Sequence, residues 1–542
     1  MKHLSSMAML FITALFVFAC SLENKTVDSS EDNNENADSD FLTCHDKWRS
    51  LEKIDNPEEY FNLDIVTETD TWKWRENGDA ESLIIDGEIF DRPEALHVAD
   101  NGTVYLGGGF SENCSEKVYC GFLYVYKADG TLVRYKWNRP LISLVKNILP
   151  VPDSESIYLN VSFPDHRELV GEKDAYQWNT KVMIGLLDKD GNFSFDAFYD
   201  EYLHECMDAV MTPEGVFMYC FEMDLFFDEK DVARVRSNKW YIMKYDEKNA
   251  IKKELFDFKG MYAGTPQHIA YDSSERVLHL ATSNLSTRGD STNLSLGINE
   301  KTLCKTSEKD GTLWEDNLSV YLDFAKGNRV ISGSMRDGYE FEHSELPDSY
   351  SSTDGYVFID GEQKQTWFKI GYFDSPPEKD EINNQTSLQF VSKDGPVYYF
   401  SGSSMGDIDD DGVSSNRNPP EIPENGYLGD QKWRYETLIF AYNSETDKAY
   451  LKQIQTSIQG EIIRDTTSDD TYLYIAGIYV PHYYDTEIPL VEDAEEGDPH
   501  YGKTFYSSSG NGYVHRIKKA DILKSENRAP ENRVFMYLKT DD

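Results

Sequence analysis

The feature that most constrains the fold of this chain is a repeated strand–turn–strand unit. Each copy has a short strand, a turn containing Asp, Gly or Ser, and a second strand rich in Val, Tyr, Ile and Leu. A period of a few tens of residues indicates a repeat architecture in which each unit packs against the next. The seven copies are ALHVADNGTVYLGGG, NILPVPDSESIYLNVS, MDAVMTPEGVFMYC, HIAYDSSERVLHLATS, YLDFAKGNRVISGS, LQFVSKDGPVYYFSG and IIRDTTSDDTYLYIAG.

Most copies are followed, after a variable loop, by a second hairpin such as FLYVYKADGTLVRYKW or LIFAYNSETDKAYLKQI. Two hairpins give four strands per unit, and the chain lacks long runs of amphipathic helical periodicity. Four antiparallel strands repeated radially around a channel form a β-propeller, which typically has four to eight blades. We therefore predict an all-β, seven-bladed β-propeller with four-stranded blades, which start near residues 94, 141, 204, 263, 319, 387 and 460.

The leading segment, residues 44–92, has no assigned repeat. It could add a strand or a blade, so a six- or eight-bladed propeller or a pair of β-sandwiches stays open, and so does the way the ring closes. The repeats resemble bacterial β-propeller repeats in general over most of the chain, without matching a named family. They lack the Gly-His and Trp-Asp signature of WD40 blades.

The N-terminus has the pattern of an export signal. Lys2 and His3 make a positive start, and Leu4–Phe18 is a mostly apolar run. This run is shorter than the roughly 20 apolar residues that span a bilayer, and an acidic stretch follows it instead of a basic flank. We predict a cleaved signal peptide rather than a retained transmembrane helix.

The apolar run ends in Val17-Phe18-Ala19-Cys20, which resembles the bacterial lipobox. The resemblance implies cleavage before Cys20 and lipidation of that cysteine with three acyl chains, and more than one chain is needed for stable anchoring. Ser21 follows in place of Asp, which implies sorting to the outer membrane. An ordinary secretory signal is the alternative. The expected organisation is a lipoprotein signal peptide at 1–19, a disordered acidic tether at 20–43 and the propeller at 44–542.

The charge of the chain limits its partners. It has 97 acidic and 53 basic residues and a formal net charge of −44. Such a field repels phosphate backbones and anionic lipid headgroups, which excludes nucleic acid as a partner. The partners that we expect are the membrane, through the lipid anchor, and an unknown protein or glycan.

Seven cysteines are present, so six remain once Cys20 is lipidated. An even number in an oxidising compartment predicts disulfides. Cys206 and Cys220 are placed symmetrically in one predicted hairpin, so they should face each other across paired strands. The other candidate pairs are Cys114 with Cys120, which would close a short loop, and Cys44 with Cys304, by elimination.

Residues 407–413 (DIDDDGV) place acids at alternate positions before a Gly, as in the first half of an EF-hand-like calcium loop. Calcium takes six to eight oxygen ligands. A solvated acidic insertion is the open alternative, because Asn418 stands at loop position twelve, where a bidentate acid is expected. The predicted ligands are the side chains of Asp407, Asp409 and Asp411 and the carbonyl of Val413.

Catalytic motifs are weak. Gly402–Gly406 fits the G-x-S-x-G pattern, which would make Ser404 a nucleophile. That motif needs a helix directly after the serine, whereas here an acidic loop follows. The histidines show no close metal-ligand spacing. We therefore predict no catalytic residue and no cofactor other than calcium.

The leading functional hypothesis is a non-catalytic binding or scaffold lipoprotein. Residues 481–511, a long insertion rich in Tyr and acids, are the first candidate for its partner-binding surface, and a disordered excursion is the alternative. The rival hypothesis is a quinoprotein-dehydrogenase-like or lyase-like enzyme with its site in the central channel. Converging His, Arg and carboxylates with a calcium ion would favour the enzyme, and an apolar channel would favour the scaffold.

Replacing Cys20 by Ala should abolish fatty-acid labelling, because the lipobox supplies this cysteine as the attachment site. Cells expressing the wild type and Cys20→Ala are grown with a radioactive fatty acid, and the purified proteins are compared by gel autoradiography. Equal labelling of both proteins would contradict the prediction.

Overall fold

The computed structural model describes residues 49–54, 63–69, 71–85, 91–110, 120–137, 144–166, 175–199, 205–227, 233–246, 250–259, 266–282, 285–287, 290–292, 294–301, 305–310, 317–325, 328–336, 353–361, 364–371, 386–405, 435–454, 456, 461–479, 486–489, 504–507, 512–530 and 533–540. The chain divides into two units. Met1–Phe41 lies outside the described residues, as does the predicted lipidation site Cys20. Leu42–Asp542 contains every element below.

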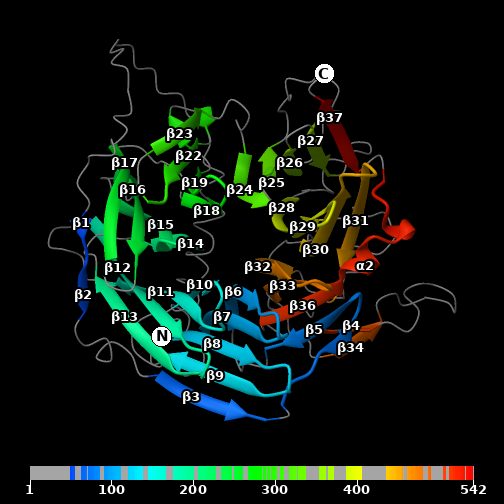
Figure 1. The fold of residues 1–542 in the computed structure, drawn as a ribbon, viewed down its shortest axis with the longest axis horizontal. Helices are drawn as coiled ribbons and strands as arrows, with labels where there is room; N and C mark the ends of the chain where they lie inside the picture. The colour runs from blue at the N-terminus through cyan, green and yellow to red at the C-terminus, as the bar shows by residue number, and fades with distance from the viewer. Residues whose placement is uncertain are drawn as a thin grey trace. The chain divides into compact units, whose positions relative to one another are not determined.

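Seven blades of antiparallel strands form a ring, which is a seven-bladed β-propeller, and two adjacent blades are joined by hydrogen bonds into one ten-stranded sheet (Figure 1). The predicted fold class is confirmed. The first strand of each blade lies nearest the axis, and these strands contact one another in sequence, with the last returning to the first. They are β6 (Asp91–Val98), β10 (Leu144–Pro150), β14 (Glu205–Thr212), β18 (Pro266–Asp272), β24 (Asn317–Ala325), β28 (Ser387–Asp394) and β32 (Glu461–Ser468).

The remaining strands of each blade follow outward in chain order. Blades 1 to 3 contain β7 (Val104–Phe110), β8 (Cys120–Tyr126), β9 (Leu132–Trp137); β11 (Ile157–His166), β12 (Ala175–Leu187), β13 (Phe193–Tyr199); and β15 (Gly215–Phe227), β16 (Ala233–Tyr245), β17 (Ala250–Lys259). Blades 4 to 7 contain β19 (Val277–Thr282), β22 (Leu294–Asn299), β23 (Lys305–Asp310); β25 (Asn328–Arg336), β26 (Thr353–Asp360), β27 (Lys364–Ile370); β29 (Val397–Met405), β30 (Tyr435–Asn443), β31 (Lys448–Ile454); and β33 (Tyr472–Tyr479), β36 (Gly512–Lys518).

The apolar core lies between the blades. β8 is buried at every residue, because both of its faces are covered by neighbouring blades. One apolar cluster contains Leu123 of blade 1 and Leu159 of blade 2, and another contains Phe368 of blade 5 and Phe440 of blade 6. Each blade therefore buries its apolar faces only when its neighbours are in place, as expected for a radial repeat.

The leading segment adds outer strands to existing blades, so it forms no extra blade. β1 (Arg49–Ser50) pairs with β17, β2 (Glu52–Ile54) with β13, and β3 (Leu63–Glu68) with β9. β4 (Arg75–Asn77) and β5 (Ala80–Ile84) complete blade 7, where β5 pairs with β36. These five strands, residues 49–84, are called the belt. Since β5 joins the last blade, the ring closes with strands from both ends of the chain.

The C-terminal segment runs over the two blades before the last. α2 (Lys519–Ile522) and the 3-10 helix η2 (Ser525–Asn527) contact β31 of blade 6, and the Ala529 amide donates to the Ala449 carbonyl at 3.1 Å. β37 (Val534–Thr540) then pairs with β27 of blade 5. Among the described strands, the outer strand of blade 4, β23, is the one that neither terminal segment covers.

The predicted disulfide between Cys206 and Cys220 is confirmed. The two residues are directly opposite in the β14–β15 register, and their Cα atoms are 3.9 Å apart. Cys120 is also disulfide-bonded. The other predicted disulfide residues, Cys114, Cys44 and Cys304, lie outside the described residues.

Candidate functional site

A β-bulge interrupts the pairing of the first strand with the second strand in every blade. Bulges re-aim side chains, and in a propeller these strands border the axis. The extra residue is charged in three adjacent blades, where it is Arg464 in blade 7, Glu94 in blade 1 and Lys146 in blade 2. The residue after the bulge is polar in six blades: it is serine in blades 5 and 6, and a larger polar or charged residue in four others, namely Asn147, Asp208, His268 and Asp465.

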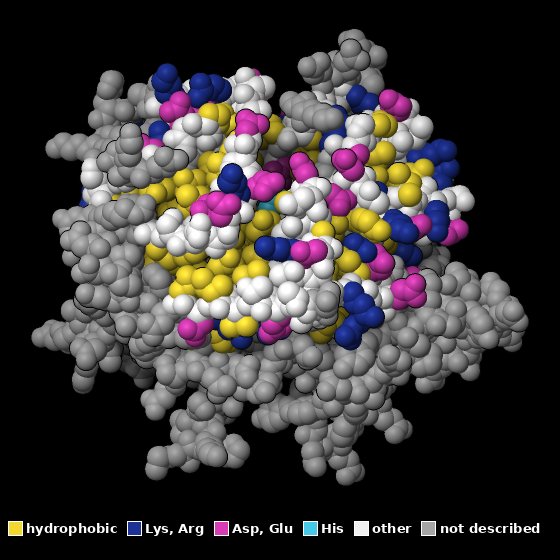
Figure 2. Space-filling model, turned by 60° about the horizontal axis from the view of Figure 1, so that its bottom comes forward, with side chains coloured by type: hydrophobic (Ala, Val, Ile, Leu, Met, Phe, Trp, Pro, Cys, Tyr) yellow, Lys and Arg dark blue, Asp and Glu magenta, His cyan; other side chains and the backbone are white. Residues whose placement is uncertain are grey.

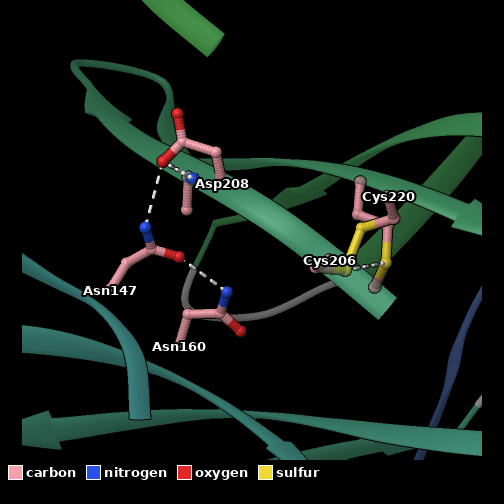
Figure 3. The surroundings of a disulfide bond; sticks show 7 residues. Asn147, Asn160, Cys206, Asp208 and Cys220 are labelled. Atoms are coloured by element: carbon pink, nitrogen blue, oxygen red, sulfur yellow. Dashed lines mark hydrogen bonds between the residues drawn. A yellow bond between two sulfur atoms is a disulfide. The ribbon is translucent and has the colours of Figure 1, made fainter. Parts of the chain in front are cut away.

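Asp208 joins three blades, and Figure 3 shows its contact with Asn147 of blade 2. Its Oδ1 accepts hydrogen bonds from Asn147 Nδ2 of blade 2 at 3.0 Å and from the Ala209 amide of its own strand at 2.8 Å. Its Oδ2 accepts the Ile269 amide of blade 4 at 3.0 Å and lies 2.5 Å from His268 Nδ1. The Cys206–Cys220 disulfide fixes the same strand two residues earlier. Both carboxylate oxygens are thus occupied by protein donors.

Asp465 repeats this arrangement at the closing junction of the ring. Its Oδ2 accepts the Leu96 amide of blade 1 at 2.7 Å, and its Oδ1 accepts the Thr466 amide at 2.8 Å. Leu96 occupies the same place in blade 1 as Ile269 does in blade 4, one residue after the position that follows the bulge. One carboxylate therefore fastens blade 7 to blade 1, as Asp208 fastens blade 3 to blade 4.

The pKa values of the two half-buried acids near this closing junction, Asp465 and Glu94, are shifted in opposite directions. Burial, together with the negative charges of Asp208 and Glu94, raises the pKa of Asp465 to about 7, against the effect of its amide hydrogen bonds. Burial would also raise the pKa of Glu94, but Lys146, Arg92 and Arg464 outweigh it and lower that pKa to about 2. Glu94 Oε2 lies 3.9 Å from Lys146 Nζ, and its Oε1 bonds Arg92.

His268 lies between two carboxylates. Its Nε2 is 3.5 Å from Asp323 Oδ2 of blade 5, while its Nδ1 faces Asp208. The Tyr321 ring meets the imidazole edge to face at 6.0 Å. Burial favours the neutral ring, but the charges and hydrogen bonds of both carboxylates hold the pKa of His268 well above its usual range. The imidazole is therefore a cation near neutral pH.

Eight ionisable groups lie near the axis and are called the axial cluster. Four are acids and four are bases, and Gln389 of blade 6 adds a neutral link to Thr466 of blade 7 at 2.9 Å. Figure 2 shows Asp and Glu side chains around a hollow on the drawn face, with a histidine visible in it. In the described part of the chain, no three His, Cys, Asp or Glu side chains are grouped to hold a metal. The members are Glu94, Asp208, Asp323, Asp465, Arg92, Lys146, His268 and Arg464.

A second polar network lies buried in blade 7. The Thr456 hydroxyl donates a hydrogen bond to Glu461, so its oxygen is free to accept one from His515 Nε2 at 2.8 Å. With the ring proton assigned to Nε2, the Nδ1 of His515 accepts the hydroxyl of Ser82 at 2.7 Å. The order of serine, histidine and acid resembles a nucleophile triad. Ser82, His515 and Glu461 are only 1%, 0% and 2% exposed, however, so no substrate reaches them. Because Ser82 lies on β5, this network fastens the belt to blade 7.

The predicted site residues have different outcomes. Ser404 is fully buried within β29, where its Oγ accepts from Gln453 Nε2 at 3.1 Å, so the geometry does not support a nucleophile. Within the insertion 481–511, β34 (Thr486–Pro489) pairs with β35 (Thr504–Ser507), and β35 contacts β4. This pair is called the ribbon. The predicted calcium ligands Asp407, Asp409, Asp411 and Val413 lie outside the described residues, and the calcium loop stays a prediction.

The sequence matches no protein-family model and no curated protein. Solved structures that the chain matches include the hydrazine synthase of Kuenenia stuttgartiensis, at 8% identity and a TM-score of 0.34 over 69% of this chain and 99% of that one. The WD40 domain of fission yeast SCAP matches at 11% identity and a TM-score of 0.32 over 89% of this chain and 100% of that domain. The phage phi92 endosialidase matches at 12% identity and a TM-score of 0.36 over 84% of this chain and 69% of that one. These proteins differ in function, and the likeness carries no argument about activity. No described helix has the length and apolar character that crossing a membrane requires.

Replacing His268 by Gln should destabilise the protein by about 1–3 kcal/mol at acidic and neutral pH, because it removes a cation from two carboxylates. The folded pKa of His268 is raised, so its contribution is full below the unfolded pKa and is lost as pH rises through the folded pKa. Urea unfolding of both proteins from about pH 5.5 to about pH 10 measures this difference.

His97 is the matched control, since burial lowers its pKa while it stacks on Tyr105. The change in the free energy of unfolding caused by His97→Gln should not become smaller toward alkaline pH. If His268→Gln lowers the free energy of unfolding by the same amount at every pH in this series, the ion-pair account is contradicted.

Proposed function

We propose that this chain is a lipid-anchored β-propeller of the outer membrane that acts outside the cytoplasm as a non-catalytic binding or scaffold protein. The observation that carries the proposal is that three of the four axial carboxylates, those of Asp208, Asp465 and Glu94, are engaged by groups of the protein. Both oxygens of Asp208 and of Asp465 accept hydrogen bonds from the protein, and Glu94 is paired with two cations. Groups engaged in this way hold blades together and leave few lone pairs for a substrate.

The proposed partner surface is the ribbon in the insertion at 481–511. Long insertions on a rigid scaffold are frequent sites of recognition, and aromatic residues provide contact area at low entropic cost. The ribbon lies beside β4 at the outer edge of blade 7, away from the axial cluster, so binding there leaves the ring contacts intact. A protein or a glycan is the proposed partner class.

Replacing residues 486–507 by a short Gly-Ser linker should remove partner capture without unfolding the propeller. Tagged mature wild type and the linker variant are used as baits on detergent-solubilised outer membrane, and captured proteins and glycans are quantified by mass spectrometry. We expect the amount of the specific partner that is captured to be at least tenfold lower with the linker variant than with the wild type. Capture that is equal with both baits would contradict the ribbon as the binding surface.

The second candidate function is an enzyme with its site at the axis. One observation favours it, namely that His268, Tyr321 and Asp323 converge beside Asp208 with a histidine of raised pKa. The same pull-down separates the two candidates when His268→Gln is added as a bait. The scaffold hypothesis expects this bait to capture the partner as well as the wild type does, whereas a substrate-binding axis expects a loss.

A further inference from the structure

The longest strand of the belt, β3, forms an open edge of the propeller. It pairs with β9 along its whole length, from Leu63 opposite Trp137 to Glu68 opposite Leu132, and no other described strand pairs with its outer edge. Figure 1 shows β3 on the outside of blade 1. The outer edge of a sheet presents backbone N–H and C=O groups, with which the strand of another chain can pair.

β3 also exposes apolar side chains. Three large apolar side chains are exposed in the described part of the chain, and two of them, Ile65 and Val66, are neighbours on β3. They are 53% and 48% exposed. Because successive residues of a strand point to opposite faces of the sheet, the middle of this edge is apolar on both faces. A second strand placed beside β3 would remove apolar surface from water on each face.

The usual protections of an edge strand are weak in β3. Edge strands are commonly protected by short length, by proline, by a bulge or by many charges. β3 contains no proline, and its pairing with β9 has no bulge. By contrast, the belt strands β1 and β2 have only two and three residues, and β23, the outer strand of blade 4, has four charged residues among its six.

The charges on and beside β3 are balanced, although the whole chain has a formal net charge of −44. Asp64 stands opposite Lys136 in the register with β9, and the Glu68 carboxylate accepts a hydrogen bond from Arg134 Nη1 at 2.9 Å. Two copies of such an acidic chain repel each other over most of their surface. At β3 two bases match the two acids, so this edge is a place where a second copy can approach.

Symmetry restricts how two copies of β3 can pair. A pair of identical antiparallel edges has a two-fold axis perpendicular to the sheet, which leaves each face of the sheet on its own side. Residues directly opposite each other in an antiparallel pair point to the same face. The axis must therefore pass between two copies of the same residue.

Charge then selects the register. An axis at Ile65 or at Val66 pairs most of the strand. The axis at Val66 places Asp64 opposite Glu68 of the second copy, and directly opposed like charges are destabilising. The axis at Ile65 places Ile65 opposite its own copy and Asp64 opposite Val66, so no two acids face each other directly.

We propose that β3 pairs with β3 of a second copy of this chain, in an antiparallel dimer whose two-fold axis passes at Ile65. The five-stranded sheets of blade 1 in the two copies then become one continuous sheet. The contact is isologous, so it closes on itself and gives dimers instead of filaments. Because a pair of short strands buries less than the roughly 1,200–2,000 Å² of a stable interface, the dimer is weak and reversible. It depends neither on the lipid anchor nor on the partner proposed for the ribbon.

Disulfide trapping tests both the pairing and its register. Purified Ile65→Cys and Val66→Cys proteins are oxidised with copper phenanthroline and followed on non-reducing gels, with the wild type as the blank. Both positions are exposed on β3, but only position 65 faces its own copy at the distance that a disulfide spans. We expect Ile65→Cys to form a covalent dimer at least tenfold faster than Val66→Cys. A Val66→Cys rate that equals or exceeds that of Ile65→Cys, or no covalent dimer from either, would overturn the proposal.

Sedimentation velocity over a concentration series gives a second test without new cysteines. Ile65→Lys places two ammonium groups opposite each other at the axis, so it should be monomeric at concentrations where the wild type dimerises. Met536→Lys is the matched control, since it adds the same charge at an exposed apolar residue of another outer strand, β37 of blade 5, and should dimerise as the wild type does.

The same variants separate this inference from the proposed function. Both substitutions lie at exposed positions, so their thermal unfolding should match that of the wild type. Equal dimer formation by the wild type and Ile65→Lys, or equal loss in both variants, would contradict pairing at β3. Partner capture by Ile65→Lys should equal that of the wild type, because the ribbon is on blade 7.

Discussion

The structure depends on the pairing of β5 with β36, because a ring of blades stays open until its two ends are joined. Tyr513 lies opposite Ile84 and Arg516 opposite Glu81, so strands from the beginning and the end of the propeller share one sheet. Beneath this pairing, Ser82 on the belt strand is bonded to the buried His515. The entropy of joining distant segments grows slowly with their separation, so one well-packed closure can hold the whole ring.

Hydrogen bonds and ion pairs near the axis also join neighbouring blades. A desolvated carboxylate is costly unless its oxygens accept hydrogen bonds, and in Asp208 and Asp465 one oxygen accepts an amide of the following blade while the other accepts an amide of the same strand. Each then acts as a fastener between blades. The charges of Glu94, Lys146 and His268 are matched in the same region, which makes the axial cluster a structural element in our account. Polar residues at a propeller axis are thus compatible with a scaffold when the blades themselves satisfy them.

The sequence predicted what is local and missed what is distant. The hairpins carry their own turn residues and alternation, so seven repeats were visible, and Cys206 and Cys220 lie in one of them. β1 and β2 have only two and three residues, too few for a pattern, so the belt could not be predicted from the sequence. An alignment of the seven repeats would have pointed to part of the axial cluster, because polar side chains recur at one position of the repeat. Asn147, Asp208, His268 and Asp465 occupy one repeat position, but their contacts come from different blades.

The most direct test of this account is the thermal unfolding of two N-terminal truncations. A chain that begins at Leu42 keeps the belt, and one that begins at Asp91 lacks all five belt strands. If the belt closes the ring, the first should unfold cooperatively at the midpoint of the mature protein, and the second should unfold at a clearly lower temperature with a broadened transition. Equal midpoints for both truncations would contradict closure by the belt.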